Sequence, residues 1–376
     1  MSKLDELIAE LCLDGVEYVK LGDVIKLEKG KQLNKEFLTE QGKYPAYNGG
    51  VTHSGFTDKY NYDENKIIIS QGGASAGFVN FVKTKFWANA HCYVVLPIEH
   101  YINNRYAYHF IKSKQTKLMD KQHGAGIPAL RSSEINNLKI PLPPLPVQQE
   151  IVRILDTFTE LIKELNAELE ARRKQYEYYR DLLLTFGDEV ELIAELCPNG
   201  VEYKKLKEVA SVSIGEFVHK NKQNPNGVYP VYNGGTSNTG FYDEFNRTAN
   251  KIIISARGAN AGFVNRVFVD FWAGNSCYTI SVEEKYLDWN FTYYVLKSSE
   301  NNLINQQQKG GIPAVSKKQL EEFYIPVPPL PVQQEIVRIL DNFTELIAEL
   351  TAELTARQKQ YEYYRDKLLS FKEVSS

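Results

Sequence analysis

A single offset of 185 residues relates the first half of this chain to the second half. Tyr47–Gly50 returns as Tyr232–Gly235 (232 − 47 = 185), and Lys66–Ser70 returns as Lys251–Ser255. Two units of that length account for nearly all of the 376 residues. A repeat of this size must form its structure twice. The chain therefore predicts two related units rather than one large core.

One stretch is repeated without any change, from Pro143 to Leu155 and again from Pro328 to Leu340. Its prolines stiffen the approach to a helix, whose first turn tolerates Pro146 and Pro331. Apolar side chains then recur at spacings of four and three residues, which predicts a long helix with a heptad seam. The first seam contains Ile151, Leu155, Phe158, Ile162, Leu165, Leu169 and Tyr176, and the second contains Ile336, Leu340, Phe343, Ile347, Leu350, Leu354 and Tyr361.

Neither helix can bury its seam alone. A helix of about 40 residues is a rod of about 60 Å with one apolar edge. The nearest matching surface is the second copy of the same helix. We therefore expect the two helices to pair as an antiparallel coiled coil, with a pseudo-twofold axis relating the repeats.

The repeated helices separate two globular segments, which we call head 1 (residues 16–140) and head 2 (residues 201–325). The remaining segments are an N-terminal segment at 1–15 that completes a cyclic repeat, a spacer helix at 141–186, a connector at 187–200 and a spacer helix at 326–376. Both heads alternate β-branched or aromatic runs with glycine turns. This pattern predicts an α/β fold with a twisted mixed sheet in each head.

The two copies agree to different degrees along their length. The spacers (141–186 against 326–371) are identical at 38 of 46 positions, whereas the heads are identical at 50 of 125. We infer that the two spacers have the same function, whereas the two heads have related but different functions.

The net charge of −3 conceals an uneven distribution. Head 1 carries 17 Lys and Arg against 11 Asp and Glu, and head 2 carries 14 against 12, whereas each spacer helix has a net charge of −2. Positive charge on the globular parts favours contact with phosphate. The charge pattern thus supports a nucleic-acid partner, more strongly for head 1 than for head 2.

Neither a membrane segment nor a metal site is indicated. No window holds 18 consecutive apolar residues and no secretory leader opens the chain, so we predict a cytoplasmic protein without membrane contact. The cysteines lack the spacing of metal ligands, and we expect reduced, packed thiols. They are Cys12, Cys92, Cys197 and Cys277.

Catalytic motifs are also missing. The sequence has no GxxxxGK[ST], no HExxH, no G-x-S-x-G and no Asn/Asp-Pro-Pro-Tyr/Phe tetrapeptide. Of six histidines only His219 lies in the second repeat. A catalytic histidine duplicated with the fold should have a counterpart, so we predict ordinary surface or loop histidines.

Binding is better supported than catalysis. Glycine- and asparagine-rich turns let the backbone approach a partner, and their polar side chains suit base edges. Gln71 and Gly72 become Ala256 and Arg257 in the second repeat, as expected of loops that read different bases; drift beside structural glycines is the alternative. Lysines on the heads suit phosphates, or else form a solvated helix face. The candidate DNA contacts are Lys31, Asn48, Gln71, Gly72, Ser75, His91, Lys114, Lys117, Lys121 and Arg131 in head 1, and Lys220, Asn233, Arg257, Asn260, Asn275, Lys297, Lys309 and Lys317 in head 2.

Taken together, these residues resemble the specificity subunit of type I restriction-modification systems. The string Pro-Pro-Leu-Pro-Val-Gln-Gln-Glu-Ile-Val-Arg-Ile-Leu-Asp carries the resemblance, and Tyr-Asn-Gly-Gly and Gly-Ile-Pro-Ala support it. The resemblance implies two target-recognition domains that read the halves of a split site in double-stranded DNA. It also implies spacers that dock two modification subunits.

The same resemblance implies a chain that is not an enzyme and binds no cofactor. S-adenosylmethionine and adenine-N6 methyl transfer would belong to the modification subunits. ATP, Mg and DNA cleavage would belong to restriction (translocase) subunits.

Two other classes of protein remain open. A scaffold with two β-rich modules on a coiled-coil brace, binding protein or carbohydrate, would suit the 24 tyrosines. A hidden nuclease or methyltransferase centre is the third reading. The basic heads and the repeated string favour the DNA reader over both.

Overall fold

The structure is a computed structural model that describes residues 3–123, 128–186, 197–198, 200–305 and 312–374. Its contacts divide the chain into unit 1 (Met1–Asn166 and Ala352–Ser376) and unit 2 (Ala167–Thr351). Each unit holds one head, the start of one long helix and the end of the other. The division runs through both long helices, so the segment boundaries given above stay predictions.

Unit 1 begins with a helix and continues with the strands and short helices of head 1. Its elements are α1 (Lys3–Leu11), β1 (Tyr18–Lys20), α2 (Leu21–Val24), β2 (Ile25–Lys29), η1 (Lys35–Phe37), β3 (Tyr44–Tyr47), β4 (Gly55–Thr57), β5 (Lys66–Ser70), β6 (Val79–Val82), β7 (Trp87–Ala88), β8 (Cys92–Pro97), α3 (Asn104–Ser113), α4 (Gln115–Asp120), α5 (Ser132–Asn136) and β9 (Lys139–Pro141). They form three sheets, of order β2-β8-β5-β6, β4-β3-β7 and β1-β9. Because β3 pairs with β7 in parallel and the other pairings are antiparallel, the predicted mixed sheet is confirmed.

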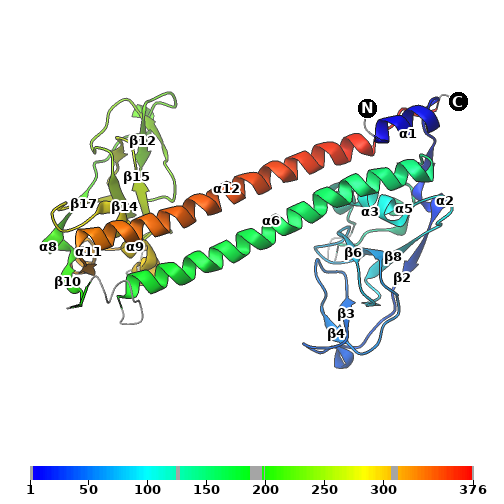
Figure 1. Cartoon of the computed structure of the whole chain (residues 1–376), viewed down its shortest axis with the longest axis horizontal. Helices are drawn as coiled ribbons and strands as arrows, with labels where there is room; N and C mark the ends of the chain where they lie inside the picture. The colour runs from blue at the N-terminus through cyan, green and yellow to red at the C-terminus, as the bar shows by residue number, and fades with distance from the viewer. Residues whose placement is uncertain (1–2, 124–127, 187–196, 199, 306–311, 375–376) are drawn as a thin grey trace. The chain divides into compact units, whose positions relative to one another are not determined.

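The main sheet of head 1 is buried on both faces. Alternation along β5 directs Ile67 and Ile69 into the core that contains Tyr106 of α3, and Ile68 into a second core with Phe86. A strand covered on both sides reads as a continuous apolar run, which is the reason for the three consecutive isoleucines. The β3–β4 hairpin lies at the end of head 1 farthest from the long helix, and α3 lies beside that helix (Figure 1).

Head 2 repeats this arrangement in unit 2. Its elements are β10 (Glu202–Lys205), α8 (Leu206–Val209), β11 (Ala210–Ile214), η2 (Lys220–Lys222), β12 (Tyr229–Tyr232), β13 (Gly240–Tyr242), β14 (Lys251–Ser255), β15 (Val264–Val267), β16 (Trp272–Ala273), β17 (Cys277–Val282), α9 (Trp289–Ser298), α10 (Glu300–Asn305), α11 (Lys317–Glu321) and β18 (Tyr324–Val327). The sheets have the orders β11-β17-β14-β15, β13-β12-β16 and β10-β18. The repeat seen in the sequence is therefore a repeat of topology.

The long helices are α6 (Leu145–Thr185) and α12 (Leu330–Leu368). They run antiparallel in each unit, since Phe158 stacks on Tyr364 in unit 1 and Tyr179 stacks on Phe343 in unit 2. The predicted antiparallel pair is confirmed. Helix α12 ends at Leu368, inside the segment 326–376 that was predicted as a spacer helix.

Burial along the seam is greatest at the helix starts. The buried positions are Ile151, Leu155, Leu169, Ile336, Leu340 and Leu354, and the half-buried ones are Phe158, Ile162, Leu165, Tyr176, Phe343, Ile347, Leu350 and Tyr361. The starts are covered because each head packs there, and Tyr176 and Tyr361 also pack against the core of a head.

Both ends of the chain belong to unit 1. Leu4 of α1 and Leu369 share the core of head 1, and Val16 forms a β-bridge with Glu373. The Tyr18 hydroxyl donates to the Phe371 carbonyl at 3.1 Å. These contacts close the repeat on itself, as a cyclic arrangement requires.

Three local predictions need correction. The run Gly77–Asn80 predicts a strand, but β6 begins at Val79, because Gly77 has a φ of +94° and forms a turn. The run Ser132–Glu134 predicts the cap of a short helix, but Ser132 is the first residue of α5, and Arg131 stands at the cap without a side-chain hydrogen bond. His109 is not a surface or loop histidine, since it lies fully buried within α3.

Within the described residues, no helix is long and apolar enough to cross a membrane. The four cysteines are free thiols, and all but Cys12 are buried. Burial raises the pKa of Cys92 to about 11 and that of Cys277 to about 12, so both stay protonated at neutral pH.

Candidate nucleic-acid interface

Four segments far apart in the sequence meet at one end of the main sheet in head 1. We call them loop cluster 1: Tyr47–Gly50, Ser70–Gly77, Asn89–Cys92 and Pro128–Arg131. Backbone hydrogen bonds join them, from Gln71 N to His91 O and from Gly73 N to Pro128 O, each at 2.8 Å. The Ser70 hydroxyl donates to Gly50 O at 3.0 Å. The cluster is thus a fixed backbone surface on which side chains can be exchanged.

Glycine is required where these loops touch. Gly49 has a φ of +79°, and a Cβ there would lie 3.0 Å from both Gly72 O and His91 O. A side chain at this point would force the loops apart. The Tyr-Asn-Gly-Gly turn is therefore a packing requirement of the cluster.

Unit 2 contains the same frame, loop cluster 2, made of Tyr232–Gly235, Ser255–Gly262, Gly274–Cys277 and Pro313–Val315. Ala256 N donates to Ser276 O at 2.8 Å, and Gly258 N donates to Pro313 O at 2.9 Å. The Ser255 hydroxyl donates to Gly235 O at 3.0 Å. Each of these hydrogen bonds has a counterpart 185 positions earlier. The two clusters therefore have the same backbone arrangement and differ in their side chains.

Nine of the predicted contact residues have exposed side chains. They are Lys31, Asn48, His91, Lys117 and Arg131 in head 1, and Arg257, Asn260, Asn275 and Lys317 in head 2. All except Lys31, Lys117 and Lys317 belong to the loop clusters, and Lys31 N bonds to Ala88 O beside cluster 1. The structure therefore gathers most of this group into two polar surfaces, one on each head.

Three other predicted contacts, and the exposed Lys317, pair with groups of the protein itself. Lys121 pairs with Glu134, Lys297 with Glu300 at 2.6 Å, and Lys317 with Glu321 at 3.3 Å. The Asn233 Oδ1 accepts from Ser276 N at 3.1 Å, so this side chain holds cluster 2 together. These residues support the loops in the observed conformation, and a role in DNA contact stays a prediction for each.

The remaining candidates are less accessible. The Oε1 atom of Gln71 is buried without a hydrogen-bond partner among the described residues, so it does not face outward as a base-reading amide would. Gly72, Ser75 and Lys114 are half-buried, and the Lys114 ammonium lies 5.5 Å from the centre of the Phe110 ring. Lys220 lies in η2, and Lys309 lies outside the described residues.

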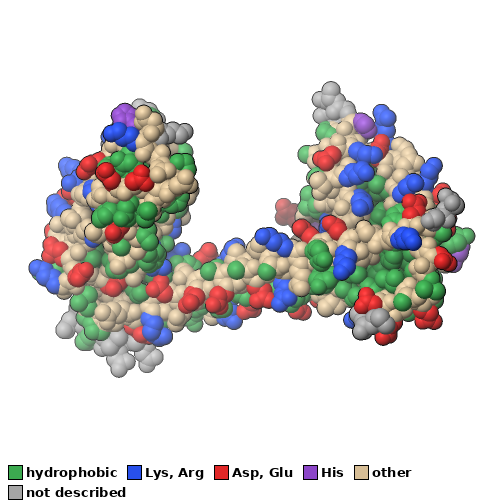
Figure 2. All heavy atoms as spheres, turned by 90° about the horizontal axis from the view of Figure 1, so that it is seen from above, with side chains coloured by type: hydrophobic (Ala, Val, Ile, Leu, Met, Phe, Trp, Pro, Cys, Tyr) green, Lys and Arg blue, Asp and Glu red, His purple; other side chains and the backbone are tan. Residues whose placement is uncertain are grey.

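A second basic surface of head 1 was not predicted. Lys43, Lys59 and Lys85 lie over the rings of Tyr44, Phe37 and Tyr60, at 5.5, 5.6 and 4.6 Å from the ring centres. The alternation of lysines with aromatic residues in the sequence was the signal that could have predicted this surface. The equivalent positions in head 2 hold Val228, Glu244 and Asp270, which explains part of the charge difference between the heads. Figure 2 shows Lys and Arg side chains over both heads, most densely over head 1.

Arg257 is the sharpest test of base reading by loop cluster 2. It is exposed, and its backbone is fixed by a β-bridge to Ala314. An arginine that donates two hydrogen bonds to guanine contributes about 1–3 kcal/mol of discrimination. We expect Arg257→Ala to weaken binding about tenfold and to relax one position of a single half-site, as measured by binding to a panel of site variants.

Arg257→Lys is the matched control, because it keeps the charge and removes the planar pair of donors. Lysine should preserve affinity better than alanine but lose the discrimination. Equal weakening at both half-sites would instead show that Arg257 has a structural role.

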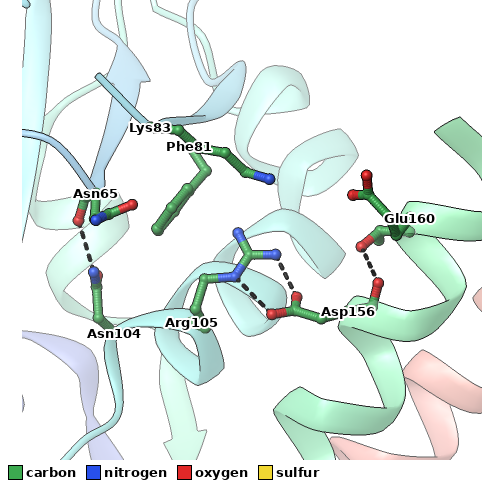
Figure 3. A pocket seen from close by; sticks show the side chains of 8 residues that line it. Asn65, Phe81, Lys83, Asn104, Arg105, Asp156 and Glu160 are labelled. Atoms are coloured by element: carbon green, nitrogen blue, oxygen red, sulfur yellow. Dashed lines mark hydrogen bonds and ion pairs between the residues drawn. The ribbon is translucent and has the colours of Figure 1, made fainter. Parts of the chain in front are cut away.

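A polar pocket of about 460 Å³ lies where head 1 meets the long helix. Figure 3 shows Arg105 between Phe81 and Asp156 in this pocket, with Lys83 and Glu160 at its rim. Behind Arg105, the Nε2 of the buried His109 lies 2.7 Å from Asp156 Oδ1. Burial lowers the pKa of His109, an effect that the hydrogen bond to Asp156 opposes. At neutral pH the histidine is therefore uncharged and donates to the carboxylate.

Local opening of helix α3 in head 1 should become more frequent in mild acid, whereas opening of helix α9 in head 2 should not. Asp156, Arg105, Tyr108, Tyr361 and Arg365 face His109. A histidine whose folded pKa lies below its ordinary 6.5 contributes stability that is complete above that pH and is lost as the pH falls below it. With one proton involved, the loss cannot exceed about tenfold in the opening equilibrium per pH unit.

The measurement is hydrogen exchange of the α3 amides relative to the α9 amides between pH 7 and pH 5. Tyr294 replaces His109 in head 2, so α9 serves as the internal reference. His109→Tyr should abolish the acid effect on α3. An acid effect of the same size in both helices would contradict this assignment.

Among the described residues, no group of three or more His, Cys, Asp or Glu side chains is placed to hold a metal ion. The loop clusters offer backbone amides, asparagines, His91 and Arg257, which are groups that can bind base edges.

Comparison with known proteins gives one family. The profile described as the type I restriction modification DNA specificity domain matches residues 14–171 and 198–357, once in each repeat. A Haemophilus influenzae protein described as a type I restriction enzyme specificity subunit is 30% identical over 402 aligned positions, covering 96% of this chain and 98% of that protein. The specificity subunit of a type I restriction enzyme from Escherichia coli is 29% identical, with 96% of each chain covered.

A solved structure has the same fold. The S subunit of a type I restriction-modification system from Mycoplasma genitalium superposes with a TM-score of 0.77 and is 24% identical. The alignment covers 94% of this chain and 96% of that one. The two repeated heads and their long helices are therefore a fold that occurs in solved S subunits.

Proposed function

Since the chain belongs to the type I restriction-modification DNA specificity family, we propose that head 1 and head 2 each read one half of a split DNA site. Its function is DNA sequence recognition within a type I restriction-modification complex. The pair of loop clusters supports recognition of a split site, because the clusters have the same backbone arrangement and expose different side chains. Two such surfaces on one chain suit two different half-sites.

The exposed residues of each cluster would read bases, and the lysines around them would contact phosphates. In head 1, Asn48, His91 and Arg131 are the base-reading candidates; in head 2, Arg257, Asn260 and Asn275 are. Lys31 and Lys117 would add phosphate contacts, joined by Lys43, Lys59 and Lys85. Phosphate contacts raise affinity for any sequence, whereas base contacts decide which sequence is chosen.

The long helices would dock two modification subunits, one on each repeat. Near identity of α6 and α12 supports this role, because two copies of one partner need two copies of one surface. We place S-adenosylmethionine and methyl transfer on those subunits, and ATP, Mg and cleavage on restriction subunits. A complex that modifies chromosomal DNA acts in the cytoplasm, where we place this chain.

The recognised site should be bipartite and not palindromic. The heads agree at only 50 of 125 positions, so their half-sites should differ. Expression with the modification subunits, followed by single-molecule sequencing of the methylated DNA, reads the motif directly. The expected result is two unlike half-sites separated by unread base pairs; a palindromic motif would refute the assignment of different specificities to the two heads.

Binding by the assembled complex tests the function itself. Duplex DNA containing the methylated motif should be retained in a gel-shift with the modification subunits present, and a scrambled duplex should not. Equal retention of both duplexes would favour a scaffold without sequence recognition.

A further inference from the structure

In each unit one arginine of the head pairs with an aspartate of the long helix, but the arginine comes from a different element in each unit. We propose that Asp156 and Asp341 are positioning residues that fix the orientation of each head on its long helix. Each head supplies a guanidinium to its aspartate. The inference rests on the proposed function, because orientation matters only if the heads read DNA.

In unit 1 the arginine is on helix α3. The Arg105 Nε donates to Asp156 Oδ2 at 3.2 Å, and its terminal nitrogen pairs with Asp156 Oδ1. The guanidinium carbon lies 4.4 Å from the centre of the Phe81 ring and 4.7 Å from that of Tyr108. Two hydrogen bonds and two rings leave the guanidinium little freedom to rotate.

In unit 2 the arginine is on strand β15. The position equivalent to Arg105 is Asn290, and the position equivalent to Phe81 is Arg266. The Arg266 guanidinium donates to Asp341 Oδ1 at 3.1 Å and to Asn290 Oδ1 at 2.8 Å. It lies 4.6 Å from the centre of the Tyr293 ring. The hydroxyl of Tyr294, which replaces His109, donates to Asp341 at 2.5 Å.

This exchange of element is the basis of the proposal. Two substitutions within one head have moved the arginine from helix to strand, yet the same contact with the spacer aspartate is present. The aspartates stand in the string that is repeated without change, whereas the heads differ at most positions. The aspartate is therefore a common docking point for heads of different sequence, and a head can meet it from either element.

The burial of both arginines supports a positioning role for the Arg–Asp pairs. The side chains of Arg105 and Arg266 are 22% and 17% exposed, so both guanidinium groups are largely covered by the head. Asp156 and Asp341 do not belong to the loop clusters. A recognition residue must be held within about 0.5 Å of its working position, so rotation of a head about its helix would disturb its contacts with bases.

The test transplants the arrangement of unit 2 into unit 1 of the full chain, assembled with its modification subunits. Arg105→Asn should lower affinity for the methylated motif about tenfold, as expected for loss of a charge-assisted pair. It should also speed hydrogen exchange in α3. The triple variant Phe81→Arg, Arg105→Asn, His109→Tyr rebuilds the arginine on the strand and should restore both measurements to within about threefold of wild type.

Two further variants complete the comparison. Asp156→Asn preserves the shape of the side chain, and it should reproduce the effect of Arg105→Asn. Lys83→Ala changes the same pocket without touching the Arg105–Asp156 pair, and it should leave affinity and α3 exchange unchanged.

The proposal is overturned if Arg105→Asn leaves exchange and affinity unchanged, or if the triple variant performs no better than Arg105→Asn. Failure of the proposed function would look different, because the wild-type complex would then not select its motif at all. Exchange in α3 is measured without DNA, so it still reports on the attachment of the head in that case.

Discussion

Replacing Gln148 by alanine is expected to lower the free energy of unfolding of unit 1 by about 3–4 kcal/mol. This side chain is fully buried in the first turn of α6. Its Oε1 accepts from Asn103 N at 2.8 Å, and its Nε2 donates to Tyr101 O at 3.1 Å and to Pro143 O at 2.7 Å. Alanine would leave these three backbone groups, one buried and two partly buried, without their partners, and an unpaired buried group costs about 1–3 kcal/mol.

Gln333 should behave in the same way in unit 2. It accepts from Asp288 N at 2.8 Å and donates to Tyr286 O at 2.8 Å and Pro328 O at 2.7 Å. In both units the amide joins the loop before the head's main helix to the entry of the long helix. Gln333→Ala should therefore destabilise unit 2 by a similar amount.

The chain provides a matched control for each substitution. Gln149 and Gln334 are the next residues, of the same type and exposed, so their replacement by alanine should change stability by less than about 0.5 kcal/mol. Hydrogen exchange of α3 and α9 amides in the full chain measures the two units separately. If the buried and the exposed glutamines gave the same loss, the hydrogen-bond explanation would be wrong.

Inserting one heptad into each long helix is expected to abolish recognition of the original site and to create recognition of a site with a longer gap. Each long helix has residues in both units, and we propose that helix length sets the spacing between the half-sites. Seven residues add about 10.5 Å, or about three base pairs at 3.4 Å each. The reading loops are unchanged, so both half-sites should keep their sequences.

The insertions belong after Asn166 and Thr351, which are equivalent positions at the division between the units. A whole heptad keeps the seam on one face of each helix. Single-molecule sequencing of methylated DNA gives the new gap directly. If the variant with both insertions methylated an unchanged motif, helix length would not set the gap between the half-sites.

A single insertion is the control for this experiment. The seams in one unit would then be out of register with each other, because Phe158 faces Tyr364 and Tyr179 faces Phe343 in the wild-type chain. We expect loss of stability and of binding to either site. If the variant with a single insertion still methylated the original site, the pairing of the two helices would not set the spacing between the half-sites.

The repeat, the two long helices and some of the strands were predictable from the sequence. Their signals are local: an offset of 185, apolar residues at spacings of three and four, and runs such as Lys66–Ser70. Backbone geometry alone converts these spacings into helices and strands. The glycine turns were also recognisable, although their contacts with one another were not.

Only the tertiary structure decided what individual side chains do. Gln148 bonds to Asn103 45 residues away, His109 is buried beside a carboxylate on another helix, and Gln71 points inward. Arg105 and Arg266 reach equivalent aspartates from non-equivalent positions, which no alignment of the two repeats would pair. Such contacts depend on the three-dimensional meeting of distant segments, and no spacing in the sequence records them. The sequence by itself determined the architecture and its duplication, and the packing of the heads on the helices determined how each head is held.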